Sequence, residues 1–159
     1  MIVTYSGCLV NEDKKESISI RQKILNLQSS MVSMESAESK CELKHTFSKG
    51  AYARQLSMPK DILIVGKIHK HGHLNIVSKG RVLVVTEFEE IEIDASKEPY
   101  TFTSEPGTKR VVYTLEDTVW TTIHLTEETD LEKIENEIIA KDYNDFDLLD
   151  NQTKCKEIS

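Results

Sequence analysis

A run of short β-rich segments, separated by turn residues at even spacing between about residues 43 and 125, constrains this fold most. Within it, Glu and Ile alternate over residues 90–93, the pattern of a strand with one exposed face. Many short strands at such regular spacing are typical of a mainly β sandwich or barrel. The expected strands are 43–47, 51–57, 62–68, 73–78, 81–87, 89–93, 100–103, 109–115 and 118–125.

A helix is expected on each side of this region. Apolar residues at steps of three and four predict an amphipathic helix over 17–35, opened by Ser19 and Gln22 as a capping box. Its stripe consists of Ile20, Ile24, Leu27, Met31 and Met34. A second capping box, Thr129 to Glu132, predicts a helix over 129–142. The stripe of the first helix must pack on the sheet or on a second subunit, and packing on the sheet is the simpler expectation.

The two ends of the chain have little core pattern. Residues 1–16 end in a run of charged residues and are expected to form a flexible arm. Residues 146–159 carry charges around little apolar surface and are expected to form a flexible tail. At 159 residues the whole chain has the length of one domain.

Charge and composition disfavour several classes of partner. The net charge of -7 disfavours general nucleic-acid binding, because a polyanion is repelled on average. No apolar run approaches the roughly 20 residues that span a bilayer, and the start lacks the pattern of a signal peptide. The three cysteines have no paired spacing, so free thiols are expected. These features predict a cytoplasmic protein with no membrane partner.

Three of the five histidines, His69, His71 and His73, are spaced two residues apart. In one extended strand they would share a face, where they could line a pocket or hold a divalent transition metal such as zinc, iron, manganese or nickel. His124 is expected as a fourth imidazole from another strand. The alternative is a set of core histidines that bond to Asn75 or to Thr and Glu side chains.

The same stretch carries a motif. It resembles the first motif of the cupin superfamily, G-x5-H-x-H-x3–4-E-x6-G, with Gly80 as the closing glycine. That register places His73 at the position of the glutamate, His69 at the second histidine and Lys67 at the first. The resemblance implies a cupin-like jelly-roll barrel over residues 43–125, with the two helices outside it.

The second cupin motif, G-x5-P-x-G-x2-H-x3-N, is matched in part. Pro106 and Gly107 supply its turn, and Arg110 falls at its histidine. Two of the four metal-ligand positions of the family are therefore cations, Lys67 and Arg110. Cations at these positions suggest a bound anion. A buried salt bridge is the alternative, with Glu87, Glu105 or Glu116 as its acid.

A wider set of segments resembles small cupin-like proteins of tailed bacteriophages. The segments are 50–54, 66–69, 73–80, 106–110 and 116–124. This resemblance implies a phage origin, a place in the host cytoplasm and a role in host interaction or anti-defence. It implies no reaction.

Three functions follow from these patterns. The first is binding of a small anionic molecule in the barrel pocket, by His69, His73, Arg110, Tyr113, His124 and Lys67. The second is a metal-dependent cupin enzyme, an oxygenase or isomerase, with His69, His73 and His71 on the metal. Tyr113 and His124 are instead an acid–base pair if the chemistry is free of metal. The third is a structural or partner-binding protein that acts through its N-terminal helix. A homodimer and a host protein are the expected macromolecular partners.

Overall fold

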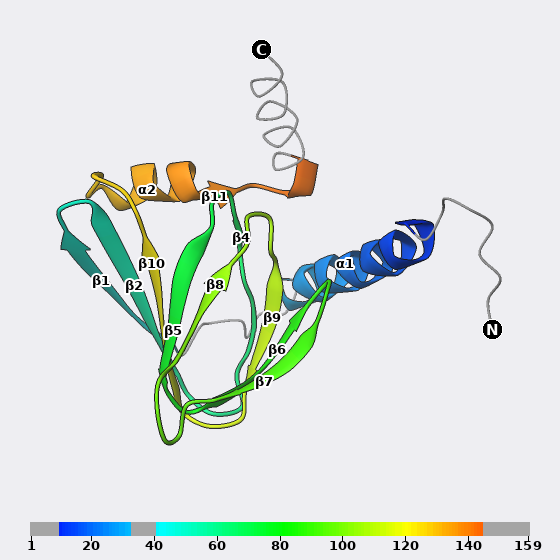
Figure 1. Cartoon of the computed structure of the whole chain (residues 1–159), viewed down its shortest axis with the longest axis horizontal. Coiled ribbons are helices and arrows are strands. Elements are labelled where there is room, and N and C mark those ends of the chain that lie inside the picture. Colours follow the sequence, from blue (N-terminus) through cyan, green and yellow to red (C-terminus); the bar gives the residue numbers. More distant parts are fainter. Residues whose placement is uncertain (1–9, 33–40, 145–159) are drawn as a thin grey trace, which may run out of the picture.

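The computed structural model describes residues 10–32 and 41–144 (Figure 1). The strands form a barrel-like sandwich, with one helix beside it and one across its end. The elements are α1 (Val10–Val32), β1 (Glu42–Ser48), β2 (Ala51–Met58), β3 (Leu63–Val65), β4 (Ile68–His69), β5 (His73–Lys79), β6 (Arg81–Thr86), β7 (Glu90–Asp94), β8 (Tyr100–Ser104), β9 (Arg110–Thr114), β10 (Thr118–His124), α2 (Leu131–Ile138) and β11 (Ile139–Ala140).

The strand order is that of a jelly roll. One sheet has the order β1-β2-β10-β5-β8 and the other has the order β3-β9-β6-β7. All neighbouring pairs in both sheets are antiparallel. The chain crosses between the two sheets after β2, β5, β7, β8 and β9, whereas β1–β2 and β6–β7 are hairpins within one sheet, a pattern typical of a jelly roll. The predicted class, a mainly β jelly roll with a helix at each end, is confirmed.

One predicted strand is divided in two. The expected strand 62–68 becomes β3 and β4, with a break at Gly66 and Lys67. β3 pairs with β9, and Gly66 donates the last hydrogen bond of this edge to the carbonyl oxygen of Arg110. β4 then leaves that sheet and pairs with β11. Alternation along the sequence cannot show this change of partner.

The core fills one end of the sandwich. Along β10, Thr118 lies opposite Met58 at the core end, and His124 lies opposite Tyr52 at the end nearer α2. Each fully buried aliphatic side chain in such a core contributes about 1.5–3 kcal/mol. The main cluster consists of Met58, Val77, Val82, Val84, Ile93, Ala95, Val112 and Trp120.

Helix α1 starts earlier than expected. It begins at Val10, so residues 10–16 of the predicted arm are helical, and Ser19 with Gln22 does not open the helix. The first turns are rich in Glu and Lys, which favour helix formation. They contain no apolar stripe, so the amphipathic pattern in the sequence does not extend over them. No helix in the described ranges is long and apolar enough to cross a membrane.

The stripe of α1 packs on the barrel. Ile24 is buried, and Leu25 packs on a cluster of Ile68, Ala140 and Tyr143. Arg21 donates two hydrogen bonds to the Glu87 carboxylate, at 2.8 and 3.1 Å, and its guanidinium lies 4.0 Å from the centre of the Tyr143 ring. Of the predicted stripe, Met34 lies outside the described residues.

Helix α2 is shorter than predicted at both ends. Its N-cap is Asp130, whose side chain accepts hydrogen bonds from the backbone N–H groups of Glu132 and Lys133, so Thr129 is not the cap. The helix ends at Ile138 because the next two residues form β11 and pair with β4. Ile134 and Ile138 are buried, whereas Leu131 is 44% exposed.

Of the glycines compared in the barrel, Gly80 leaves the least room for a side chain. Its φ is +88°, and an added Cβ would lie 2.3 Å from the carbonyl oxygen of Asp117. We expect Gly80→Ala to lower the free energy of unfolding by about 2–4 kcal/mol, measured by urea denaturation. Gly50→Ala is the control, because Gly50 also has a positive φ, +77°, but its Cβ would meet only Glu127 at 3.5 Å. Equal losses for the two variants would contradict a steric cause at Gly80.

Candidate functional site

A cavity of about 510 Å³ opens between the sheets at the end covered by α2. Its walls come from both sheets and from α2. The polar lining consists of His45, Arg54, Lys67, His69, Asn75, Arg110, Thr122, His124 and Glu135. The apolar lining includes Leu43, Leu56, Met58, Ile64, Val112, Trp120, Leu131, Ile134 and Ile138. The cavity therefore combines a cationic, histidine-rich wall with a largely apolar remainder.

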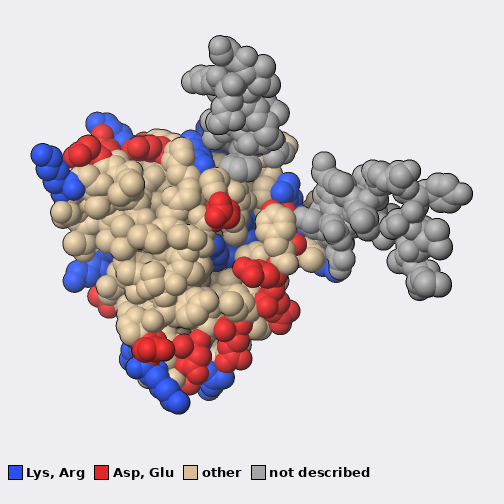
Figure 2. All heavy atoms as spheres, viewed as in Figure 1, with Lys and Arg blue, Asp and Glu red and all other residues tan. Residues whose placement is uncertain are grey.

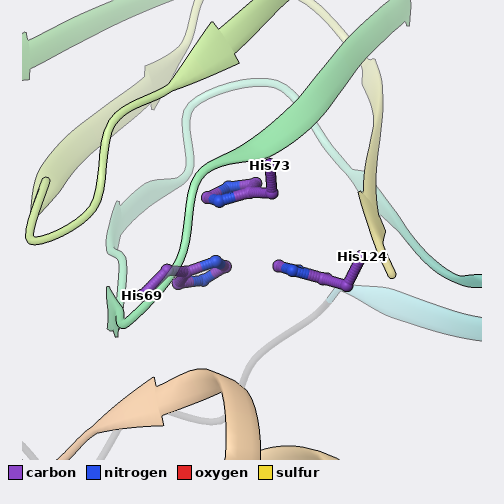
Figure 3. Close-up of side chains that lie close together, drawn as sticks. All are labelled: His69, His73 and His124. Carbon is purple, nitrogen blue, oxygen red and sulfur yellow. The ribbon is translucent and has the colours of Figure 1, made fainter. Parts of the chain in front are cut away.

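Three histidines from three strands meet at this cavity. The ring centres of His69 and His73 are 4.2 Å apart, those of His73 and His124 are 4.7 Å apart, and those of His69 and His124 are 5.0 Å apart. One ring nitrogen from each lies within 4.8 Å of the other two. Figure 3 shows the three rings converging on one point. We call these three residues the histidine triad.

His71 does not belong to the triad. The chain bends between β4 and β5, so the row of alternating histidines is not one extended strand. His71 lies in this bend and is exposed, whereas the rings of His69 and His73 on either side lie close together and face His124. The expectation that all three share one strand face is thus corrected. His124, expected from another strand, takes the third place.

Two ring nitrogens of the triad make no hydrogen bond to a described residue and are available to a ligand. His73 Nδ1 lies 3.3 Å from the backbone oxygen of His71, a contact in which Nδ1 donates. Its Nε2 then carries the lone pair, and this atom is buried without a hydrogen-bond partner among the described residues. Nδ1 of His69 is buried without such a partner as well. Buried polar atoms of this kind are rare unless a ligand or water satisfies them.

The triad is neutral at physiological pH. Burial, together with the neighbouring His73 and His124, lowers the pKa of His69 to about 2. Burial likewise lowers the pKa of His124 to about 4 and lowers that of His73. Neutral imidazoles present lone pairs, the form in which histidine binds metal ions.

Arg110 is held beside the triad by a buried polar chain. Its Nη2 donates to Ser104 Oγ at 2.6 Å, and the same oxygen is 2.6 Å from the donating Nδ2 of Asn75. The Trp120 indole N–H donates to Asn75 Oδ1 at 3.0 Å. Burial lowers the pKa of Arg110, and its Nε is buried without a hydrogen-bond partner in the described part of the chain. Trp120 is a core residue whose hydrogen bond to Asn75 also holds this polar chain in place.

Arg54 is a pocket residue that the sequence-based prediction missed. It lies on β2 between Tyr52 and Leu56, which face the cavity too, and its charge lowers the pKa of His69 and of His124. The signal that could have identified it is the strand alternation, since Tyr52, Arg54 and Leu56 share one face. Arg54 and Arg110 therefore flank the triad from opposite sheets.

The remaining predicted residues lie at the edge of the site or away from it. Lys67 lines the cavity but is exposed, and it pairs with Glu135 of α2 and not with any of the three acids expected. Tyr113 does not line the cavity, and its hydroxyl donates to the Asp61 carboxylate at 2.9 Å. The structure therefore does not bring Tyr113 and His124 together as an acid–base pair.

Comparison with known proteins finds likeness only among solved structures. No protein-family model matches the sequence, and no curated protein matches it either. KdgF from Halomonas sp. is 15% identical, with a TM-score of 0.46 over 57% of this chain and 81% of its own. An RmlC-like cupin from Shewanella frigidimarina is 15% identical, with a TM-score of 0.47 over 59% and 84%. The Cnp3 cupin domain of Schizosaccharomyces pombe is 15% identical, with a TM-score of 0.46 over 68% and 73%. The jelly-roll assignment rests on the strand order alone.

Proposed function

We propose that the barrel pocket binds a small organic anion, with a carboxylate as the simplest head group. The observation that carries this proposal is the excess of cations in the cavity wall. Arg54 and Arg110 form no ion pair with a described acid, and the single acid of the lining, Glu135, is paired with Lys67. The Arg110 guanidinium is half-buried, with its Nε fully buried, and such a group is unfavourable without a carboxylate. Arg54 also lines the cavity but is exposed, and an anionic ligand would bind both side chains.

The apolar part of the cavity wall indicates the chemistry of the remainder of the ligand. Leu56, Met58, Ile64 and Val112 form a wall without charge below the triad. A cavity of about 510 Å³ has the size of an ordinary small-molecule site. The ligand is therefore an amphipathic anion, with its head at the arginines and its apolar part towards the core. If the chain is of phage origin, as the resemblance to phage proteins suggests, host metabolites and signal molecules are the first compounds to screen.

A thermal-shift screen followed by calorimetry tests this function. Carboxylates with an apolar body are expected to raise the melting temperature, because a ligand that binds only the native state stabilises it. Arg54→Gln should weaken the best ligand by at least about tenfold through the lost charge-assisted hydrogen bond. Arg81→Gln is the matched control, since Arg81 is an exposed arginine outside the cavity. A panel in which no compound raises the melting temperature would contradict the proposal. Equal losses of ligand affinity in Arg54→Gln and Arg81→Gln would contradict it as well.

A divalent transition metal in the histidine triad is the second candidate. The converging rings, the neutral imidazoles and the orphaned ring nitrogens fit such an ion. Three histidines form a known protein ligand set for zinc with one open position. A bound metal would act as a Lewis acid towards a ligand head group held in the cavity.

The two candidates support one another. The triad supplies no negative charge, and Arg54 and Arg110 repel a dication. An anion in the cavity would offset both effects, so metal and anion should each raise the affinity for the other by the same factor. The third function, partner binding through the N-terminal helix, gains less support because Arg21 and Ile24 are already engaged with the barrel.

A further inference from the structure

One row of side chains crosses the five-stranded sheet on the side of the cavity. The row runs from β2 through β10 and β5 to β8, and it consists of Arg54, Thr122, Asn75 and Phe102. Residues directly opposite one another on paired strands point to the same side of a sheet, so the whole row faces inward. Its first three members line the cavity. We call these four residues the cavity row.

Arg110 reaches the far end of the cavity row from the opposite sheet. Its guanidinium carbon lies 5.8 Å from the centre of the Phe102 ring, and its Nη2 donates to Ser104 Oγ on the same strand as Phe102. In the sheet order β2 and β8 are separated by β10 and β5, which corresponds to about 14 Å at the usual strand spacing. Arg54 and Arg110 therefore lie at opposite ends of the row, with the uncharged Thr122 and Asn75 between them.

The effects of the two arginines on the histidine triad agree with this placement. Burial is the main cause of each lowered pKa in the triad, and the arginines add to it unequally. Arg54 lowers the pKa of His124, and Arg110 lowers that of His73. Both arginines lower the pKa of His69. The triad thus lies between two separate cations.

Neither cation has a counter-charge in the described part of the chain. The six ion pairs found there involve other basic residues. On β7 of the opposite sheet, Glu90 and Glu92 alternate with Ile91 and Ile93, which face inward, so these acids point away from the cavity. Figure 2 shows acidic side chains gathered over β7 on the surface. Both ends of the cavity row are therefore open to an anionic group.

We propose that the ligand of the pocket is a dianion, a short dicarboxylate with one carboxylate bound by Arg54 and the other by Arg110. This assignment rests on the proposed function and narrows the ligand from an organic anion to a dicarboxylate. The Arg110 Nε has no hydrogen-bond partner among the described residues and remains available to a carboxylate. A carboxylate held bidentately by Arg110 uses both of its oxygens there, so Arg54 requires a second anionic group.

The residues around the row indicate what joins the two carboxylates. The adjacent row on the core side consists of Leu56, Trp120 and Val77, which are all apolar. Both polar atoms of the Asn75 side chain are already engaged, Oδ1 by the Trp120 indole and Nδ2 by Ser104. A polar group in the middle of the ligand would be desolvated here without full compensation. An uncharged hydrocarbon chain therefore fits between the two ends.

Calorimetry with linear dicarboxylates from malonate to suberate, each compared with its own monoamide, tests this assignment. The monoamide has the same length but one anionic group, so the comparison isolates the second charge. The dicarboxylate of best length is expected to bind the wild type at least about tenfold more tightly than its monoamide, because charge-assisted hydrogen bonds are the stronger ones. In Arg54→Gln the two affinities are expected to agree within about twofold, since the second carboxylate then lies in solvent and is screened.

Two further variants serve as controls. Arg81→Gln should keep the full preference for the dicarboxylate, because Arg81 is outside the cavity. Arg54→Lys keeps the positive charge and should keep part of the preference, which separates a loss of charge from a change in packing. Arg54 is exposed, so the variants at this position are expected to fold, and circular dichroism checks this.

The results distinguish the dianion from the broader proposal of an anion. Equal affinities of the wild type for dicarboxylate and monoamide would overturn the dianion and leave anion binding supported. A preference that Arg54→Gln retains would overturn it as well. Failure of both series to bind would also overturn the dianion, and the thermal-shift screen with other carboxylates then decides separately whether the pocket binds an anion at all.

Discussion

Zinc titrated into chelator-treated protein is expected to bind one equivalent to the wild type and at least 100-fold more weakly to His124→Ala. The substitution leaves His69 and His73, and two imidazoles are fewer than the three protein ligands of an open zinc site. The affinity is measured by competition with a chromophoric chelator, and the stoichiometry by elemental analysis. The size of the effect follows from the loss of one of three ligands, since even the loss of an outer partner costs 10–100-fold.

His71→Ala provides the control for this experiment. His71 lies in the same sequence motif but is exposed and outside the triad, so zinc affinity should not change. A comparable loss of zinc affinity in His71→Ala would indicate that the ion binds at the bend and not in the cavity. A wild type that takes up less than a tenth of an equivalent would contradict the metal candidate and leave anion binding unaffected.

Acid is expected to destabilise the protein steeply below pH 6.5. The pKa of His69 is lowered to about 2 and that of His124 to about 4, with His73 shifted in the same direction, whereas in the unfolded chain each is near 6.5. Between these values the unfolded state binds more protons than the native state. The contribution of the neutral triad to the free energy of unfolding is therefore fully present above pH 6.5. It falls as the pH drops, by up to about 1.4 kcal/mol per pH unit for each histidine.

Urea denaturation at pH 7.0 and pH 5.5 measures this dependence. The free energy of unfolding should fall by about 2–4 kcal/mol between them if the triad contributes as its burial indicates. His69→Gln should flatten the dependence, because a residue that cannot titrate is removed from the triad. His71→Gln should leave the slope as it is, since that side chain is exposed. Equal slopes for wild type and His69→Gln would contradict the lowered pKa of His69.

Most of the barrel could be predicted because its signals are local. Strand alternation depends on neighbouring residues, so β5 and β10 were placed within one residue of their observed ends. The partner of a strand is not local. Nothing in residues 62–68 shows that β4 leaves the sheet to pair with β11, and nothing in residues 139–142 shows that helix gives way to strand there.

The site was predicted only in part, because some of its residues are marked by local motifs and others are brought in by non-local strand pairing. The motif register identified His69, His73 and Arg110, and all three line the cavity or meet in the triad. His71 was included because spacing alone assumes a straight strand, and the bend between β4 and β5 removes it. Arg54 was missed because it lies in neither cupin motif and reaches the cavity through the pairing of β2 with β10.

The pairing of β4 with β11 also makes the histidine triad depend on a segment outside both large sheets. Both sheets are complete in residues 42–124, without β11. His69 lies directly opposite Ile139, so the strand that carries it has β11 as its ladder partner. Local opening of β11 would therefore release His69 from the triad while both sheets stay intact.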